Sequence, residues 1–116
     1  MLDINIVEKG WGFEKWITNT EKYCGKLLHF ESGKKCSWHY HIIKDEVFYI
    51  HSGKIRLLYG LNDNKDEATE LILNPGDHFH VPPRMRHQML AIQETDLYEF
   101  STQHFEEDSI RVERGD

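Results

Sequence analysis

The sequence has few cysteines, no long apolar run and no excess of basic residues, and each shortage argues against a class of protein. Cys24 and Cys36 are the only cysteines, and their spacing fits neither a zinc motif nor a redox motif. We expect two buried, reduced thiols, although the spacing alone leaves a disulfide open. No apolar run approaches the roughly 20 residues of a membrane span, and the N-terminus lacks a secretion-signal pattern. A cytoplasmic protein without a membrane partner is the expectation.

Basic residues are outnumbered by acidic ones. The chain has 14 Lys and Arg against 20 Asp and Glu, a formal net charge of −6, and no basic cluster. This balance argues against a nucleic-acid partner. At 116 residues the chain is long enough for one domain with its own core. Because no linker or repeat divides it, residues 1–116 are predicted to form a single domain.

No segment of useful length shows a helical period, which indicates an all-β fold. Short runs rich in β-branched and aromatic residues alternate with turn signals. The predicted strands are Phe13–Thr18, Tyr23–Glu31, Ser37–Ile42, Glu46–His51, Lys54–Tyr59, Thr69–Leu73, His78–Val81, Gln88–Ile92 and Asp96–Thr102. Ser52-Gly53 is predicted to be a tight hairpin turn, and Pro82-Pro83 a bend. The tail 104–116 is expected either to dock as an edge strand or to stay loose.

Eight histidines stand out in so short a chain. His39 and His41 share one face of a predicted strand because side chains alternate. Glu46 shares its face with Phe48 and Ile50, which are apolar and are expected to point inward. A buried carboxylate is costly without compensation, and a metal ion bound together with the two imidazoles would compensate it.

His87 adds a third imidazole from a distant part of the sequence. It shares a face with Met89 and Ala91, which again is typical of an interior position. Three imidazoles and one carboxylate suit one divalent transition metal, namely Zn, Mn, Fe, Ni or Co. We therefore predict His39, His41, Glu46 and His87 as the ligands, with positions left open for water or a small-molecule ligand.

Two segments resemble the conserved motifs of the cupin superfamily. Residues 33–53 resemble the first motif through a glycine at each end and the two histidines and glutamate between them. Residues 76–91 resemble the second motif through Gly76, Pro82 and His87. Arg84 and Ala91 depart from it, since cupins usually carry glycine and asparagine there. The resemblance implies a double-stranded β-helix, the cupin jelly-roll barrel, with the metal inside and often a homodimer.

A weaker resemblance concerns sugar chemistry. Residues 7–14 and 23–28 look like the opening of type II phosphomannose isomerases and related small sugar-isomerase cupins, although Gly10 replaces their proline. The ending, residues 101–111, looks like small cupins linked to sugar and sugar-nucleotide metabolism. These features imply a sugar or sugar phosphate as ligand.

Three functions remain open. The first is a metal-dependent sugar or sugar-phosphate isomerase or epimerase, in which a polarised carbonyl acidifies a C–H and a nearby base moves the proton. The second is a non-haem iron dioxygenase of a small acid or thiol, which would need ferrous iron and oxygen. The third is a non-catalytic binding module for a metal and a small molecule, which gains if the pocket holds no second acid/base group.

Candidate bases and cations follow from these functions. The candidate bases are His51, Tyr59, His78, His80 and Glu99. His51 lies on the face opposite Glu46 and is expected to point outward. His78 and His80 are expected to be exposed if the residues between and after them are core. Lys26, Arg84 and Arg86 are candidates for holding a substrate phosphate or carboxylate.

Overall fold

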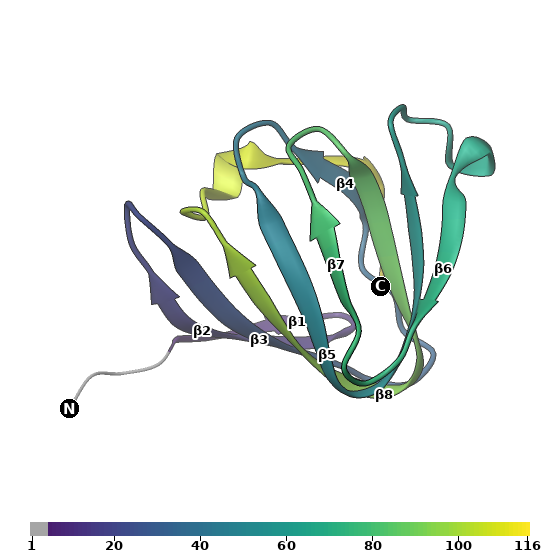
Figure 1. Cartoon of the computed structure of the whole chain (residues 1–116), viewed down its shortest axis with the longest axis horizontal. Helices are drawn as coiled ribbons and strands as arrows, with labels where there is room; N and C mark the ends of the chain where they lie inside the picture. The colour runs from purple at the N-terminus through teal and green to yellow at the C-terminus, as the bar shows by residue number, and fades with distance from the viewer. Residues whose placement is uncertain (1–4) are drawn as a thin grey trace.

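A computed structural model describes residues 5–116, and nearly all of its regular structure is β-strand (Figure 1). The strands are β1 Asn5–Lys9, β2 Gly12–Asn19, β3 Cys24–Phe30, β4 Trp38–His41, β5 Glu46–Gly60, β6 Thr69–Leu73, β7 His78–Val81, β8 Arg86–Ser101 and β9 Ser109–Glu113. Two 3₁₀ turns, η1 Lys65–Glu67 and η2 Glu106–Asp108, complete the described elements. No helix within these residues is long and apolar enough to cross a bilayer.

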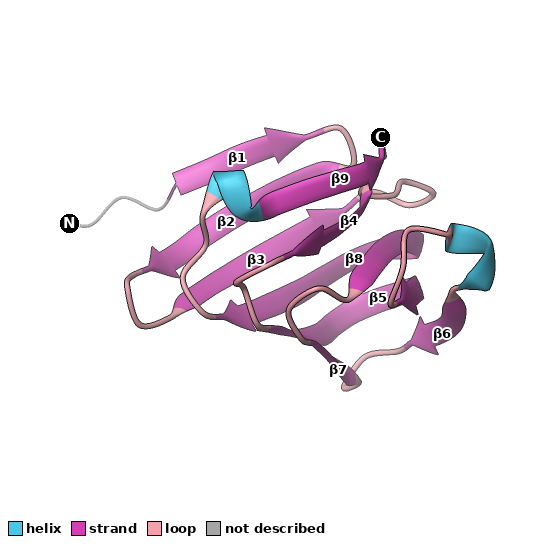
Figure 2. Ribbon diagram, turned by 90° about the horizontal axis from the view of Figure 1, so that it is seen from above, coloured by secondary structure: helices cyan, strands magenta, loops and turns pink. Residues whose placement is uncertain are grey.

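One antiparallel sheet curls on itself to form the expected jelly-roll barrel (Figures 1 and 2). Its strand order runs β1-β2-β3-β8-β4-β9, and β5 pairs with β6, β7 and β8. β5 and β8 are the two longest strands, and they pair from Glu46↔Ser101 to Gly60↔Arg86. Because this long ribbon bends, each of its strands contributes side chains to two walls of the barrel.

The predicted hairpin turn at Ser52-Gly53 is wrong. β5 continues through these residues, and the register against β8 shifts there, as in a β-bulge. Gly53 has φ +95°, and a Cβ at this position would collide with the carbonyl oxygen of Glu94. The Thr95 hydroxyl accepts a hydrogen bond from the Lys54 amide at 3.0 Å. The glycine therefore bends a continuous strand instead of reversing the chain.

Two other strand predictions need correction. Gln88–Ile92 and Asp96–Thr102 are parts of the single strand β8, because the partner strand β5 pairs with both parts. β1 was not predicted; it pairs with β2 in register from Asn5↔Trp16 to Lys9↔Gly12. In the C-terminal tail, residues Ser109–Glu113 form β9, which pairs with β4.

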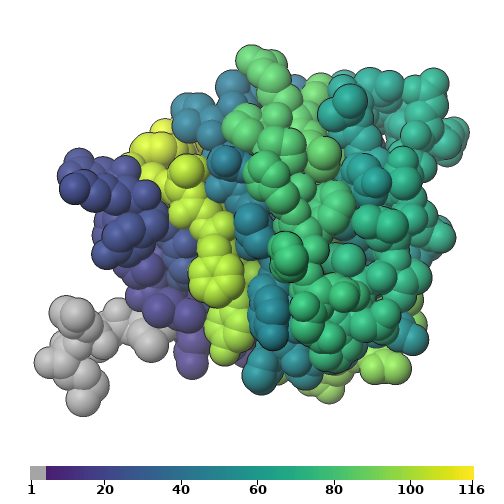
Figure 3. All heavy atoms as spheres, viewed as in Figure 1, coloured from purple at the N-terminus to yellow at the C-terminus, as the bar shows by residue number. Residues whose placement is uncertain are grey.

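The apolar core lies inside the barrel and borders the polar residues of the interior, as Phe48 does beside His87. Its buried side chains include Phe30, Ile50, Ile55, Leu57 and Leu97. On the face seen in Figure 3, side chains of β5, β7 and β8 form a continuous layer over the sheet. The alternation that placed Glu46 with Phe48 and Ile50, and His87 with Met89 and Ala91, on inward faces is confirmed by their burial.

Candidate metal centre

Three backbone carbonyls fix the orientation of three histidine rings. The Nδ1 atoms of His39, His41 and His87 lie 2.8, 3.1 and 3.0 Å from the carbonyl oxygens of Ser37, Asp108 and Met85. Since a carbonyl oxygen can only accept, each Nδ1 carries the proton and donates it. Each Nε2 is therefore left with its lone pair available, as in a histidine that ligates a metal.

The three rings meet in space although two strands supply them. His39 and His41 come from β4, and His87 from the start of β8, where it is the direct register partner of His39. One ring nitrogen from each residue lies within 4.8 Å of those of the other two. The rings of His39 and His87 have centroids only 4.3 Å apart. This spacing suits three ligands of one cation.

Glu46 brings a carboxylate to the same place. Its Oε2 lies 3.4 Å from Nε2 of His41 and 3.4 Å from Nε2 of His87. Among the described residues, Glu46 Oε2 and His87 Nε2 are the buried side-chain polar atoms without a hydrogen-bond partner. Buried polar atoms are rarely left unpaired. A cation between them would satisfy both, so the donor set fits a metal.

His39 and His41 are held neutral. Burial, reinforced by the neighbouring His87 and Lys44, lowers the pKa of His39 well below its ordinary value of 6.5. Burial and the positive charge of Lys44 also lower the pKa of His41. Because their pKa values are lowered, protons compete less with a metal ion for the lone pairs of these imidazoles. We call His39, His41, His87 and Glu46 the histidine wall.

Asp108, which the sequence did not single out, supports this wall from behind. Its carboxylate accepts hydrogen bonds from three successive amides, those of Ile42, Ile43 and Lys44, at 2.9, 3.0 and 3.0 Å. Its own carbonyl accepts from His41. One buried residue thus fixes both the His41 ring and the loop that connects β4 to Glu46.

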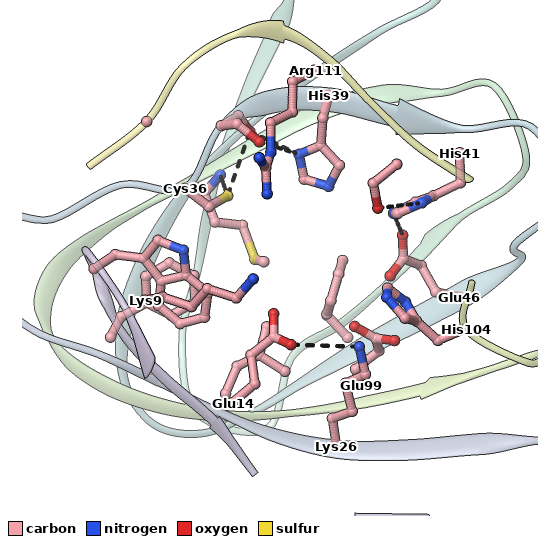
Figure 4. A pocket seen from close by; sticks show the side chains of 18 of the residues that line it. Lys9, Glu14, Lys26, Cys36, His39, His41, Glu46, Glu99, His104 and Arg111 are labelled. Carbon is pink, nitrogen blue, oxygen red and sulfur yellow. Dashed lines mark hydrogen bonds and ion pairs between the residues drawn. The ribbon is translucent and has the colours of Figure 1, made fainter. Parts of the chain in front are cut away.

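A second polar cluster adjoins the histidine wall, with His104 next to Glu46 (Figure 4). Lys44 Nζ is 2.9 Å from Glu99 Oε2, 3.6 Å from Glu46 Oε1 and 3.0 Å from His104 Nδ1. Lys26 Nζ is 3.5 Å from Glu14 Oε1 and lies over the Trp16 ring. We call this cluster the charged wall; its residues are Glu14, Lys26, Lys44, Glu99 and His104.

The charges of this wall stabilise one another. Burial alone would raise the pKa of Glu99, but the ammonium groups of Lys44 and Lys26 outweigh it and lower that pKa to about 2. For Lys44, burial lowers the pKa, and the carboxylates of Glu46 and Glu99 more than reverse this effect. Burial and the nearby lysines lower the pKa of His104. The pocket therefore holds an ionised carboxylate facing neutral imidazoles.

The two walls line one cavity of about 560 Å³. This volume is in the range of small-molecule sites. Its lining includes His39, His41 and Glu46 of the histidine wall and Glu14, Lys26, Lys44, Glu99 and His104 of the charged wall. The cavity is thus large enough for a small polar ligand that contacts both walls.

A model of the cupin domain family matches residues 26–100, which is more than half of the chain. The chain belongs to the cupin family. No curated protein matches it. Among solved structures, KdgF from Halomonas sp. is similar with a TM-score of 0.75 and 19% identity, over 91% of this chain and 90% of that chain.

Larger proteins contain a similar cupin fold. CapF of Staphylococcus aureus, a capsular polysaccharide assembling protein, has a TM-score of 0.82 at 16% identity, over 97% of this chain and 35% of that chain. The oxalate decarboxylase of Bacillus subtilis has a TM-score of 0.79 at 16% identity, over 94% of this chain and 30% of that chain. This cupin spans about a third of the length of these two relatives. At such identities the likeness shows the fold.

The structure separates the candidate bases. Glu99 is buried and lines the cavity. His51, His78 and His80 are exposed and do not line it, because Phe79 and Val81 take the inward positions of β7. Tyr59 packs against Phe79, with ring centroids 4.9 Å apart, and also lies outside the cavity lining.

The candidate cations are separated in the same way. Lys26 is 1% exposed and lines the cavity. Arg86 stacks on Tyr40 and pairs with Asp63 at 2.9 Å, outside the lining. Arg84 is exposed in the turn before β8.

Cys24 and Cys36 are both free and buried, and burial raises the pKa of the Cys36 thiol to about 12.

Proposed function

We propose that this cupin is a metal-dependent isomerase or epimerase of a sugar or sugar phosphate, with His39, His41, Glu46 and His87 holding one divalent transition metal. One observation carries the proposal: Glu46 Oε2 and His87 Nε2 are buried, unpaired and 3.4 Å apart. The Nδ1 hydrogen bonds of the three rings support it, since they leave every Nε2 available.

We propose Glu99 as the residue that moves the proton. It is the one candidate base from the sequence that lines the cavity, and Lys44 and Ser101 hold its carboxylate at 2.9 and 3.1 Å. Its low pKa keeps it ionised at neutral pH but makes it a weak base, so it needs an acidified C–H. A bound divalent metal supplies this acidity by polarising the adjacent carbonyl.

The residues of the cavity also bear on the two alternative functions, a non-catalytic binding module and a dioxygenase. A non-catalytic module is disfavoured because Lys44, Glu99 and His104 provide acid/base groups beside the candidate ligands. A non-haem iron dioxygenase would use the same ligand set, and its need for ferrous iron and oxygen distinguishes it. The fold shared with CapF, a capsular polysaccharide assembling protein, supports a carbohydrate ligand.

The test combines metal analysis with solvent deuterium exchange. Purified protein is analysed for metal and then incubated in D₂O with a panel of aldoses, ketoses and their phosphates. We expect one divalent ion per chain and, for at least one sugar, deuterium at the carbon next to the carbonyl. Oxygen consumption without deuterium incorporation would instead identify the dioxygenase. Metal-free protein that binds no added divalent ion would overturn the proposal.

His41→Ala tests the ligand assignment. Protein sites bind a structural zinc ion with about 10–16 kcal/mol in total, so each of four ligands contributes roughly a quarter of it. Loss of one ligand is therefore expected to weaken metal binding by about 100- to 1,000-fold. Circular dichroism should remain that of a folded barrel because His41 is not part of the apolar core cluster. His51→Ala, which changes an exposed histidine outside the cavity, is the matched control. Unchanged metal affinity in His41→Ala would remove this residue from the ligand set.

We also propose that the protein forms a homodimer. Large apolar side chains are exposed on the outer face of the sheet, among them Tyr49, Ile72 and Phe100. Apolar groups of this size are often covered by a partner. Sedimentation velocity is expected to give twice the monomer mass, and Phe100→Asp is expected to lower it; a monomeric wild type would contradict the proposal.

A further inference from the structure

The acidic side chains that line the cavity already have partners within the described residues. Besides the metal-facing Glu46, the paired carboxylates and their partners are Glu14 with Lys26, Glu99 with Lys44, Glu106 with His104, Glu113 with Lys65 and Asp116 with the Lys35 amide. None of these carboxylates is paired with Lys9 or Arg111.

Three lining cations, Lys9, Arg111 and Arg114, have no side-chain hydrogen bond or ion pair within residues 5–116. Arg114 follows the end of β9, whereas Lys9 and Arg111 lie within strands, whose register fixes the face that each side chain takes. Arg111 of β9 is the register partner of His39, so both side chains point to the same side of the sheet. In the strand register, Lys9 lies opposite Gly12, and Gly12 lies opposite the inward-facing Phe30, so Lys9 also faces the interior. Figure 4 shows both side chains reaching into the cavity.

We propose that Lys9 and Arg111 bind an anionic group of the substrate, a phosphate or a carboxylate. This inference rests on the proposed function and narrows its substrate class to acidic or phosphorylated sugars. An unpaired guanidinium and an ammonium facing one cavity provide a bidentate donor and a point charge, the combination that favours such anions. Because Arg111 neighbours His39, the anionic group lies close to the histidine wall.

This assignment replaces the cations expected from the sequence for good physical reasons. Arg86 has its guanidinium occupied by Tyr40 and Asp63, and Lys26 is occupied by Glu14 and Trp16. Lys9 is half-buried and Arg111 exposed, so both remain accessible to a ligand entering the cavity. Neither was singled out in the sequence, because β1 and β9 lie at the two ends of the chain.

The test measures binding, so it does not depend on turnover. Glucose, glucose 6-phosphate and glucuronate share one ring and differ in charge, and each is titrated by calorimetry into metal-loaded and metal-free protein. We expect the two anions to bind at least about 10-fold more tightly than glucose, as charge-assisted hydrogen bonds allow. Lys9→Met and Arg111→Met, which keep the aliphatic stem, should remove most of this preference, so that the two anions bind about as weakly as glucose. Lys22→Met and Arg56→Met, at exposed sites outside the lining, are the controls.

The outcomes separate this inference from the proposed function. Equal binding of the three sugars, a preference unchanged in both variants, or no response to any sugar or to inorganic phosphate would overturn the anion site. The phosphate and carboxylate arms show which anion is preferred. Deuterium exchange on a neutral sugar would leave the proposed function standing after such a failure. Conversely, protein without metal affinity that still loses anion binding in Arg111→Met would support the anion site alone.

Discussion

The two walls of the cavity solve the problem of burying polar groups in opposite ways. In the histidine wall, Glu46 and His87 keep atoms without hydrogen bonds, and the pKa of His39 is lowered, so the ring stays neutral. In the charged wall, Lys44 and Glu99 are ionised and satisfy each other at 2.9 Å. The histidine wall thus keeps unpaired atoms that a bound cation would satisfy, whereas the charged groups of the other wall already have partners, one of which is Glu46.

This difference indicates where stability and binding reside. A satisfied buried ion pair resists change, because removal of one member leaves an uncompensated charge. Unpaired buried atoms lower the unfolding free energy of the metal-free protein, and a bound cation that pairs with them raises it again. The charged wall is therefore expected to dominate mutational effects on folding, and the histidine wall to dominate effects on metal affinity.

The largest expected effect on folding comes from Lys44→Met. It leaves Glu99 and Glu46 buried without their ammonium partner, and we expect the metal-free protein to lose about 3–5 kcal/mol of unfolding free energy in urea. Arg56→Met, which breaks the exposed pair with Glu70, should cost less than about 1 kcal/mol. Similar losses in both variants would show that the charged wall has no special role in stability.

Acid is expected to act on the two walls in separate pH windows. In the folded state the pKa values of His39 and His41 lie below the ordinary 6.5, so the unfolded chain binds more protons once the pH falls below 6.5. Stability of the metal-free protein should then fall by roughly 1.4 kcal/mol per pH unit for each histidine.

The charged wall responds at lower pH. Because the pKa of Glu99 is lowered from 4.5 to about 2, its contribution is present above pH 4.5 and is lost as the pH falls toward 2. Urea unfolding across this range should show both phases in the wild type and only the first in Glu99→Gln. A flat profile between pH 6.5 and 5 would contradict the assignment of neutral, buried histidines.

A smaller effect is expected from Asp108, which positions the histidine wall without belonging to it. Asp108→Ala frees the amides of Ile42, Ile43 and Lys44, and we expect metal affinity to fall about 10- to 100-fold, as for other residues that orient ligands. Asp108→Asn keeps one acceptor oxygen and should recover part of the loss.

Asp45→Ala is the control for Asp108, since it removes an exposed carboxylate from the same loop whose partner is His80. Metal affinity is measured by competition with a chromophoric chelator. A drop in stability with unchanged affinity in Asp108→Ala would mean that this residue only holds the loop and does not position the ligands.

The histidine wall could be read from the sequence because strand alternation is local. His39, His41 and Glu46 lie within eight positions, and apolar neighbours revealed which face is buried. The charged wall could not be read in the same way. Lys44 lies in a loop without periodicity, and its contacts with Glu99 and His104 join residues more than 50 positions apart.

Local sequence patterns also gave a wrong prediction where one pattern is typical of two different backbone structures. Ser52-Gly53 suits a hairpin turn and a bulge equally well, and the long pairing of β5 with β8 decides for the bulge. Lys9 and Arg111 escaped notice because only the docking of β1 and β9 brings the two ends of the chain to one cavity.

The smallest expected effect concerns a turn behind the histidine wall. Arg84 has φ +73° in the turn after Pro82-Pro83, and its amide donates to the His41 carbonyl at 2.6 Å. A side chain in this left-handed region costs about 1–2 kcal/mol, and glycine avoids that cost while adding freedom to the unfolded chain. We therefore expect Arg84→Gly to stabilise the protein by roughly 0.5 kcal/mol in urea, with metal affinity unchanged. Arg84→Ala keeps the Cβ and should gain nothing, so equal gains in both variants would place the effect in the lost guanidinium and not in the backbone.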